Sequence, residues 1–157
     1  MAFLQWMEDT SFSDWILTSS EGWPLMLTIH AIGLAIVVGV VFSMNLRILG
    51  FYGTIPYTSL NDILRIAWIG ILMNVITGFS IFMTQAVSYV TSVPFLTKIT
   101  FIILGIANLV YTQKVLKREA AAWQAAGAVP RIGYVLAGTS LFFWIVAVIT
   151  GRLIAYL

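Results

Sequence analysis

The sequence predicts an all-α fold: an integral membrane four-helix bundle with a short N-terminal interfacial segment and with both termini on the outer side. Of its 157 residues, 61% are hydrophobic and only 9% are charged, whereas about a quarter of the residues in a soluble domain are charged. Long stretches without a charged residue occur at 22–46, 66–97 and 132–151. Because a helix needs about 20 apolar residues to cross the hydrocarbon core, each stretch is long enough to span a membrane.

The first 20 residues are expected to lie along the membrane surface. They carry three acidic side chains and lack the basic start of a signal peptide, so we expect this segment to be retained. Trp6 and Trp15 favour the level of the lipid headgroups.

Turn signals set the limits of the spans, which together form a single domain, residues 1–157. Gly53 and Pro56 mark the first connection, and Pro94 begins the third span. The alanine-rich stretch 119–126 can extend the third helix beyond the membrane until Gly127 stops it. The four spans are expected at about 23–49, 62–90, 94–117 and 132–157.

Basic residues predict the orientation. Six of the eight lysines and arginines flank the first and third connections, and loops rich in these residues face the cytoplasm. We therefore expect a multi-pass protein of the bacterial cytoplasmic membrane with a periplasmic N-terminus and C-terminus. The net charge of +2 arises at these juxtamembrane positions, so no nucleic acid is expected as a partner. The expected surroundings are the lipid bilayer and other membrane subunits or further copies of the chain.

Lys98 is a charged residue that the third span cannot leave outside the membrane. Only 15 uncharged residues follow it, 99–113, and they cover about 22 Å of the roughly 30 Å of hydrocarbon. A helix of sufficient length must start near Pro94, which draws Lys98 about one turn into the bilayer. An ionisable residue at such a depth is a functional-site hypothesis, and the alternative is a side chain that snorkels to the outer headgroups.

Two further basic side chains are expected at the same level. His30, the only histidine, lies about 10 Å below Trp23, and Arg152 approaches the outer face from the fourth span. No carboxylate lies inside the spans to pair with His30, Lys98 and Arg152, so an anionic or metal-containing group would balance them. The alternatives are a hydrogen-bonded core histidine for His30 and an interfacial anchor for Arg152.

Haem b meets this requirement. An imidazole such as that of His30 is a common axial ligand, and haem propionates pair with arginine or lysine. Lys98 is the candidate second ligand if its amine is neutral, and otherwise binds a propionate together with Arg152. Met83 is an alternative sixth ligand at matching depth, or simply a packing residue. With no cysteine and one histidine, the chain offers no thiolate site, covalent haem or multi-histidine cluster.

Small and amide residues are interpreted as packing contacts between helices. Two stripes recur every fourth residue, and intramembrane asparagines such as Asn74 and Asn108 are expected to hydrogen-bond across helices. The stripes are Ala31, Ala35, Gly39 and Ser43 in the first span, and Ala147, Gly151 and Ala155 in the fourth.

Four segments resemble a family of bacterial four-helix membrane proteins known only as a domain of unknown function. They are WPLMLTIHAIGLAIVVG, NLRILG, VPFLTKITFIILGIANLVY and GRLIAYL, in this order. A histidine in the first span with a lysine early in the third, here His30 and Lys98, is also similar to the pattern of HemJ-type protoporphyrinogen oxidases and copper-resistance D (CopD) proteins. In the HemJ-type proteins this pair is implicated in haem b binding, so the resemblance implies haem ligation by His30 and Lys98.

The chain departs from the resembled pattern at two positions. Asn45 stands where an acidic residue is expected, and Thr112 stands where relatives often carry a histidine. With one histidine left, a two-haem wire across the membrane is not expected.

These observations leave three functional hypotheses. The first is a haem b-binding membrane protein that acts as an electron-transfer or accessory subunit of a larger membrane redox complex. The second is a non-catalytic structural subunit that braces such a complex without a cofactor. The third is a porphyrinogen or quinone oxidoreductase that uses the same site, with a quinone as an additional ligand. The sequence leaves open whether the protein is an enzyme.

Overall fold

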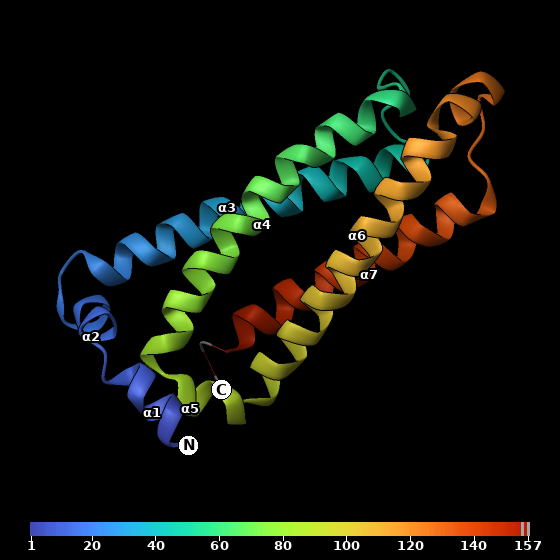
Figure 1. The fold of residues 1–157 in the computed structure, drawn as a ribbon. Helices are drawn as coiled ribbons and strands as arrows, with labels where there is room; N and C mark the ends of the chain where they lie inside the picture. Colours follow the sequence, from blue (N-terminus) through green and yellow to red (C-terminus); the bar gives the residue numbers. More distant parts are fainter. Residues whose placement is uncertain (155, 157) are drawn as a thin grey trace.

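The computed structural model describes residues 1–154 and 156, which form seven α-helices, one short 3-10 turn and no strand. Four helices are long and apolar enough to cross a membrane. This confirms the predicted all-α class and the four spans (Figure 1). The spanning helices are α3 (Gly22–Ile48), α4 (Leu60–Thr84), α6 (Val93–Ala126) and α7 (Arg131–Leu153).

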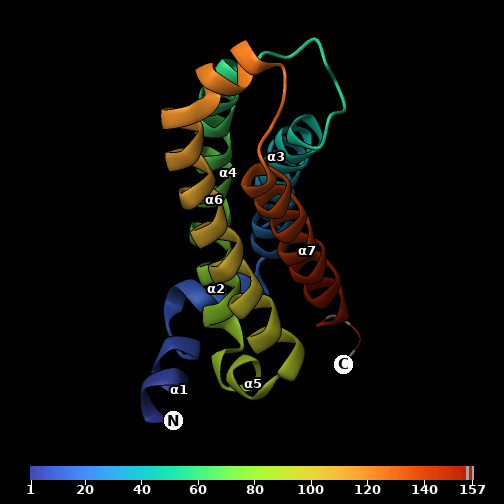
Figure 2. The same cartoon turned by 90° about the vertical axis from the view of Figure 1, so that its right-hand side faces the viewer.

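The four spanning helices form two antiparallel hairpins. α3 packs mainly against α4, and α6 packs mainly against α7. The α3–α4 and α6–α7 connections lie at one end of the bundle, and α1, α5 and the last turn of α7 lie at the other (Figures 1 and 2). We call these the inner end and the outer end. The 3-10 turn η1 (Tyr57–Ser59) belongs to the inner end and packs against α6.

The second span is shorter than predicted. α4 ends at Thr84 rather than near Val90, because Gln85 leaves the helical conformation with φ −148° and ψ 44°. The following residues form a separate short helix, α5 (Ala86–Thr91). The Glu8 carboxylate accepts a hydrogen bond of 2.9 Å from the Val87 N–H, which satisfies a free donor at the start of α5.

The third and fourth spans agree better with the sequence. α6 continues through the alanine-rich stretch to Ala126 and stops at Gly127, which has φ 63° and so supplies the left-handed residue of a helix end. α7 runs from Arg131 to Leu153. Ala155 and Leu157 lie outside the described residues. The prediction included both in the fourth span, and it included Ala155 in the small-residue stripe.

The N-terminal segment forms two short helices, α1 (Ala2–Glu8) and α2 (Ser11–Thr18), at the outer end. α2 packs against α3 and α4, whereas α1 packs against α4 and α5. Trp6 and Trp15 remain exposed. This placement suits the expected interfacial segment, since both tryptophans are free to reach lipid headgroups.

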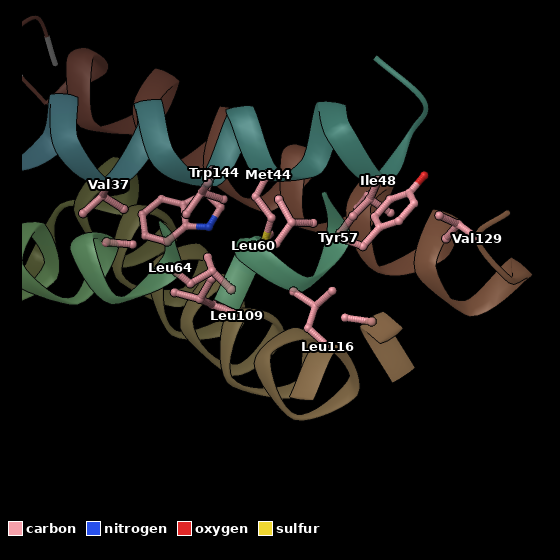
Figure 3. Packing of buried hydrophobic residues seen from close by; sticks show 14 of the residues in the cluster. Val37, Met44, Ile48, Tyr57, Leu60, Leu64, Leu109, Leu116, Val129 and Trp144 are labelled. Atoms are coloured by element: carbon pink, nitrogen blue, oxygen red, sulfur yellow. The ribbon is translucent and has the colours of Figure 1, made fainter. Parts of the chain in front are cut away.

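The hydrophobic core occupies the inner half of the bundle (Figure 3). It extends from the inner end to about the middle of the spanning helices, where Val37, Ile71 and Trp144 are its last members. Side-chain hydrogen bonds tie the two hairpins together only in this half, among the residues that the structure describes. They are Asn45 Nδ2 to Ser140 Oγ at 2.8 Å, Trp68 Nε1 to Gln113 Oε1 at 3.2 Å, and the Tyr57 N–H to Gln124 Oε1 at 2.8 Å.

The small-residue stripe predicted for the first span does not make a helix contact. All four of its members are exposed, and a Cβ atom added at Gly39 would meet nothing within 4 Å. α3 instead approaches α4 through a different face, where Gly33 lies against Gly70. The rotation of α3 about its axis therefore differs from the rotation that the stripe predicted. In α7 the expectation holds better, because Ala147 is buried and Gly151 lies against α6.

The two asparagine predictions have different outcomes. Asn108 on α6 donates hydrogen bonds to the Leu136 carbonyl and to Thr139 on α7, which confirms a bond across helices. The Asn74 amide donates to the carbonyl of Gly70 on its own helix, so it does not form the expected bridge.

Candidate ligand-binding cavity

A cavity of about 1440 Å³ lies between the two hairpins in the outer half of the bundle. It begins where the core ends, because Val37, Ile71 and Trp144 belong both to the core and to the cavity wall. All four spanning helices contribute to the wall. Small-molecule pockets usually measure about 300–1,000 Å³, so this cavity has room for a large ligand.

The structure brings together three of the four residues that the sequence analysis selected. His30 from α3, Lys98 from α6 and Arg152 from α7 all line the cavity. No aspartate or glutamate is among its lining residues. The expected convergence of basic groups without a carboxylate is therefore present in the described chain.

The fourth residue, Met83, is not among the lining residues. The face of α4 that meets the cavity includes Gly78, Phe82 and Gln85, whereas the Met83 carbonyl accepts a 3.5 Å hydrogen bond from Ser13 on α2. The predicted depth also fails, because α4 ends at Thr84 and His30 lies beside Thr77 and Gly78, five to six residues deeper than Met83. The structure therefore does not bring Met83 to the other three residues.

His30 is held in one orientation by a hydrogen bond between α3 and α4. Its Nδ1 atom lies 2.9 Å from Thr77 Oγ1, and the Thr77 hydroxyl donates its hydrogen to the Met73 carbonyl at 2.7 Å. A hydroxyl has one hydrogen only, and with that hydrogen on the Met73 carbonyl Thr77 accepts from His30 Nδ1–H. This assigns the tautomer in which the lone pair lies on Nε2, and Nε2 has no hydrogen-bond partner within residues 1–154 and 156.

Gly78 gives the His30 ring its space. A Cβ atom at this position would lie 3.3 Å from His30 Cε1, which is tighter than ordinary van der Waals contact. The combination of a ring held at Nδ1 and free at Nε2 is the usual arrangement of a histidine that ligates a metal centre.

Lys98 lies against α7. A Cβ atom at Gly151 would be 3.4 Å from both Cδ and Cε of Lys98 and 3.6 Å from its Nζ, so the absence of a side chain at Gly151 makes room for the lysine. Lys98 is half-buried and makes neither a side-chain hydrogen bond nor an ion pair with any described residue. Its amine is available to a ligand.

Arg152 lies on the same cavity wall but is exposed. Its guanidinium also makes no ion pair in the part of the chain that the structure describes. The three basic groups therefore differ in exposure: the imidazole is held in place by Thr77, the amine of Lys98 is half-buried and the guanidinium of Arg152 is exposed. Such a set can bind one metal-containing group and its anionic substituents.

Several residues that line the cavity or support its wall escaped the sequence analysis. Thr77 is one of many threonines, and nothing in its spacing indicates that it contacts His30. Phe82, Tyr89 and Phe95 line the outer part of the cavity and stack on one another. The break at Gln85 brings Tyr89 to this cluster, and no local sequence signal predicted that break.

Within the described residues there is no group of three or more His, Cys, Asp or Glu side chains that could hold a metal ion. Among the described residues that line the cavity, His30 is the one member of these four types. No protein-family model, curated protein or solved structure matches this chain.

Proposed function

We propose that the protein binds haem b in the outer cavity and serves as an electron-transfer or accessory subunit of a larger membrane redox complex. The orientation of His30 carries this proposal. Its Nδ1–H is bound to Thr77 and its Nε2 lone pair is free at the wall of a large apolar cavity. This is the state in which an imidazole binds iron.

The neighbouring residues fit the rest of the haem group. Lys98 supplies either a second axial ligand or a partner for a propionate, and Arg152 supplies a second propionate partner nearer the outer end. The described residues of the wall include no aspartate or glutamate, which suits an anionic ligand. A bound haem would supply one-electron redox chemistry, while the chain orients it and excludes water from it.

The proposed setting follows from the sequence. The resemblance to a bacterial four-helix family of unknown function and, more distantly, to HemJ-type and copper-resistance D proteins supports haem binding at His30 and Lys98. The clustering of basic residues at the first and third connections supports a bacterial cytoplasmic membrane with periplasmic termini. In that orientation the cavity faces the periplasmic half of the bilayer.

The visible absorption spectrum of the purified full chain tests the proposal. The protein is produced with an adequate haem supply, and we expect a Soret band that His30→Ala abolishes. Thr28→Ala is the matched control, because Thr28 is an exposed polar residue of the same helix and is not part of the cavity wall. A colourless wild-type protein that cannot be loaded with haem would refute the proposal and favour the bracing role.

Lys98→Met separates the two roles of Lys98. If its amine binds iron, the substitution changes the position of the Soret band and the reduction potential. If it pairs with a propionate, the band keeps its position while haem binding weakens. Lys117→Met is the control, since Lys117 is an exposed lysine of the same helix outside the cavity.

A further inference from the structure

A second, smaller pocket of about 220 Å³ lies at the outer end of the bundle. It shares Gln85, Tyr89 and Ile154 with the wall of the large cavity, so the two spaces adjoin. Its remaining lining residues are Ser88 and Ser92. The volume lies below the usual range for a whole drug-sized molecule and suits a single headgroup.

The chemistry of this pocket differs from that of the His30 site. None of the described residues that line it is charged. The side chains of Gln85, Ser88 and Tyr89 make no hydrogen bond within residues 1–154 and 156, and Ser92 Oγ accepts from the Phe95 N–H but keeps its own hydrogen. The pocket therefore offers several neutral hydrogen-bond donors to a ligand.

An aromatic cluster stands next to these donors. The rings of Tyr89 and Phe95 stack at 5.1 Å with an interplanar angle of 24°, and those of Phe82 and Phe95 stack at 5.6 Å and 16°. All three rings also line the large cavity. Their arrangement gives a planar ligand a surface on which to stack.

We propose that this pocket binds the ring of an isoprenoid quinone. A quinone ring is planar and uncharged, and its carbonyl oxygens accept hydrogen bonds from groups such as the Gln85 amide and the Tyr89 hydroxyl. The shared wall at Ile154 gives its apolar chain a route along the large cavity. A phospholipid fits less well, because its charged headgroup would favour Lys98 and Arg152 over a neutral pocket. This site does not require haem, so it goes beyond the proposed function.

Quenching of tryptophan fluorescence by decylubiquinone, added to the purified full chain in detergent, tests this proposal. Trp23 and Trp144 line the large cavity and report on a bound quinone. We expect saturable quenching. Tyr89→Leu removes stacking and a hydrogen bond and should weaken binding about tenfold, and Gln85→Leu should weaken it about fivefold.

Matched controls make the result specific. Tyr134→Leu and Gln5→Leu replace exposed residues of the same types outside both pockets and should leave the affinity unchanged. Tyr89→Phe keeps the stacking ring and should lose only the hydroxyl contribution, about fivefold, which covers the case in which Tyr89→Leu fails to fold.

Two outcomes would overturn the proposal. One is quenching that is not saturable or that is equal in the Tyr89 and Gln85 variants and the wild type. The other is complete displacement of decylubiquinone by phosphatidylglycerol, which would identify a lipid site. Decylubiquinone binding is measured on haem-free protein and the Soret band on haem-loaded protein, so failure of the haem proposal and failure of the quinone proposal are separate observations.

Discussion

Gly70→Ala tests the close approach of α3 and α4 that positions His30 beside Thr77. A Cβ atom at Gly70 would lie 2.8 Å from the Gly33 carbonyl oxygen and 2.8 Å from Val37 Cγ2. A favourable carbon–oxygen contact needs about 3.3–3.6 Å, and a backbone carbonyl cannot rotate away as a side chain can. The helices would have to separate by roughly 0.5 Å. Overpacking of this kind destabilises by about 1–3 kcal/mol.

The intrinsic helix propensity of alanine opposes this effect. Replacing glycine by alanine within a helix gains up to about 1 kcal/mol without any packing change. Gly39→Ala on α3 is the reference variant, because a Cβ atom there would meet nothing within 4 Å. Gly70→Ala should therefore be less stable than Gly39→Ala by about 1–3 kcal/mol, even if it differs less from the wild type.

Equilibrium unfolding in mixed detergent micelles of increasing SDS content, followed by tryptophan fluorescence, measures the difference. The two variants are compared under the same conditions, and reversibility is checked by dilution from SDS. If Gly70→Ala proves as stable as Gly39→Ala, the two helices are not in contact at Gly33 and Gly70, and the account of how His30 is held next to Thr77 fails with it.

Two further predictions concern the His30 contact and the inner end. Thr77→Val removes the acceptor for His30 Nδ1–H and should weaken haem binding about 10- to 100-fold in a titration, whereas Thr77→Ser should stay close to the wild type; equal affinities of Thr77→Val and the wild type would contradict the assigned tautomer. Arg47, which is only 7% exposed, donates to Tyr57 Oη at 3.0 Å and lies 3.9 Å from the centre of that ring. A double-mutant cycle of Arg47→Met and Tyr57→Leu in the SDS assay should give a coupling energy of about 1–2 kcal/mol, and additive effects would show that the pair does not interact.

The four spans were predictable because bilayer thickness sets the length of a spanning helix and hydropathy shows where in the sequence such a helix lies. The level of His30, Lys98 and Arg152 in the bundle was predictable for the same reason, since each residue contributes about 1.5 Å along a helix axis. Distance from a span's end gave the height of these three side chains, but it failed for Met83 because α4 ends at Thr84.

The height of a residue along a helix does not say which way its side chain points, and the wrong predictions of helix faces follow from this. Met83 is absent from the face of α4 that lines the cavity, and the stripe through Gly39 has the right spacing but is exposed. Helix rotation depends on which pair of faces packs best, here Gly33 against Gly70, and that is a property of two helices together.

The end of the second span depends on a contact that is distant in sequence. The break at Gln85 precedes a helix whose first turn is capped by Glu8, 79 residues earlier. No window of local sequence contains both partners. The Tyr89 cluster and the small pocket depend on this break, which is why the candidate quinone site emerged only from the fold.

Among the described residues, the side-chain hydrogen bonds between the two hairpins lie in the inner half, and this bears on how the protein is assembled. Each hairpin can enter the bilayer as a unit, and the two can dock through Asn45, Ser140 and the surrounding core before any prosthetic group arrives. Under the proposed function, haem would enter last, between the two hairpins at the outer end. Haem-free protein should accumulate in the membrane with its inner half packed, rather than as unfolded chain. Amide hydrogen exchange in the outer turns of the spanning helices should slow when haem binds.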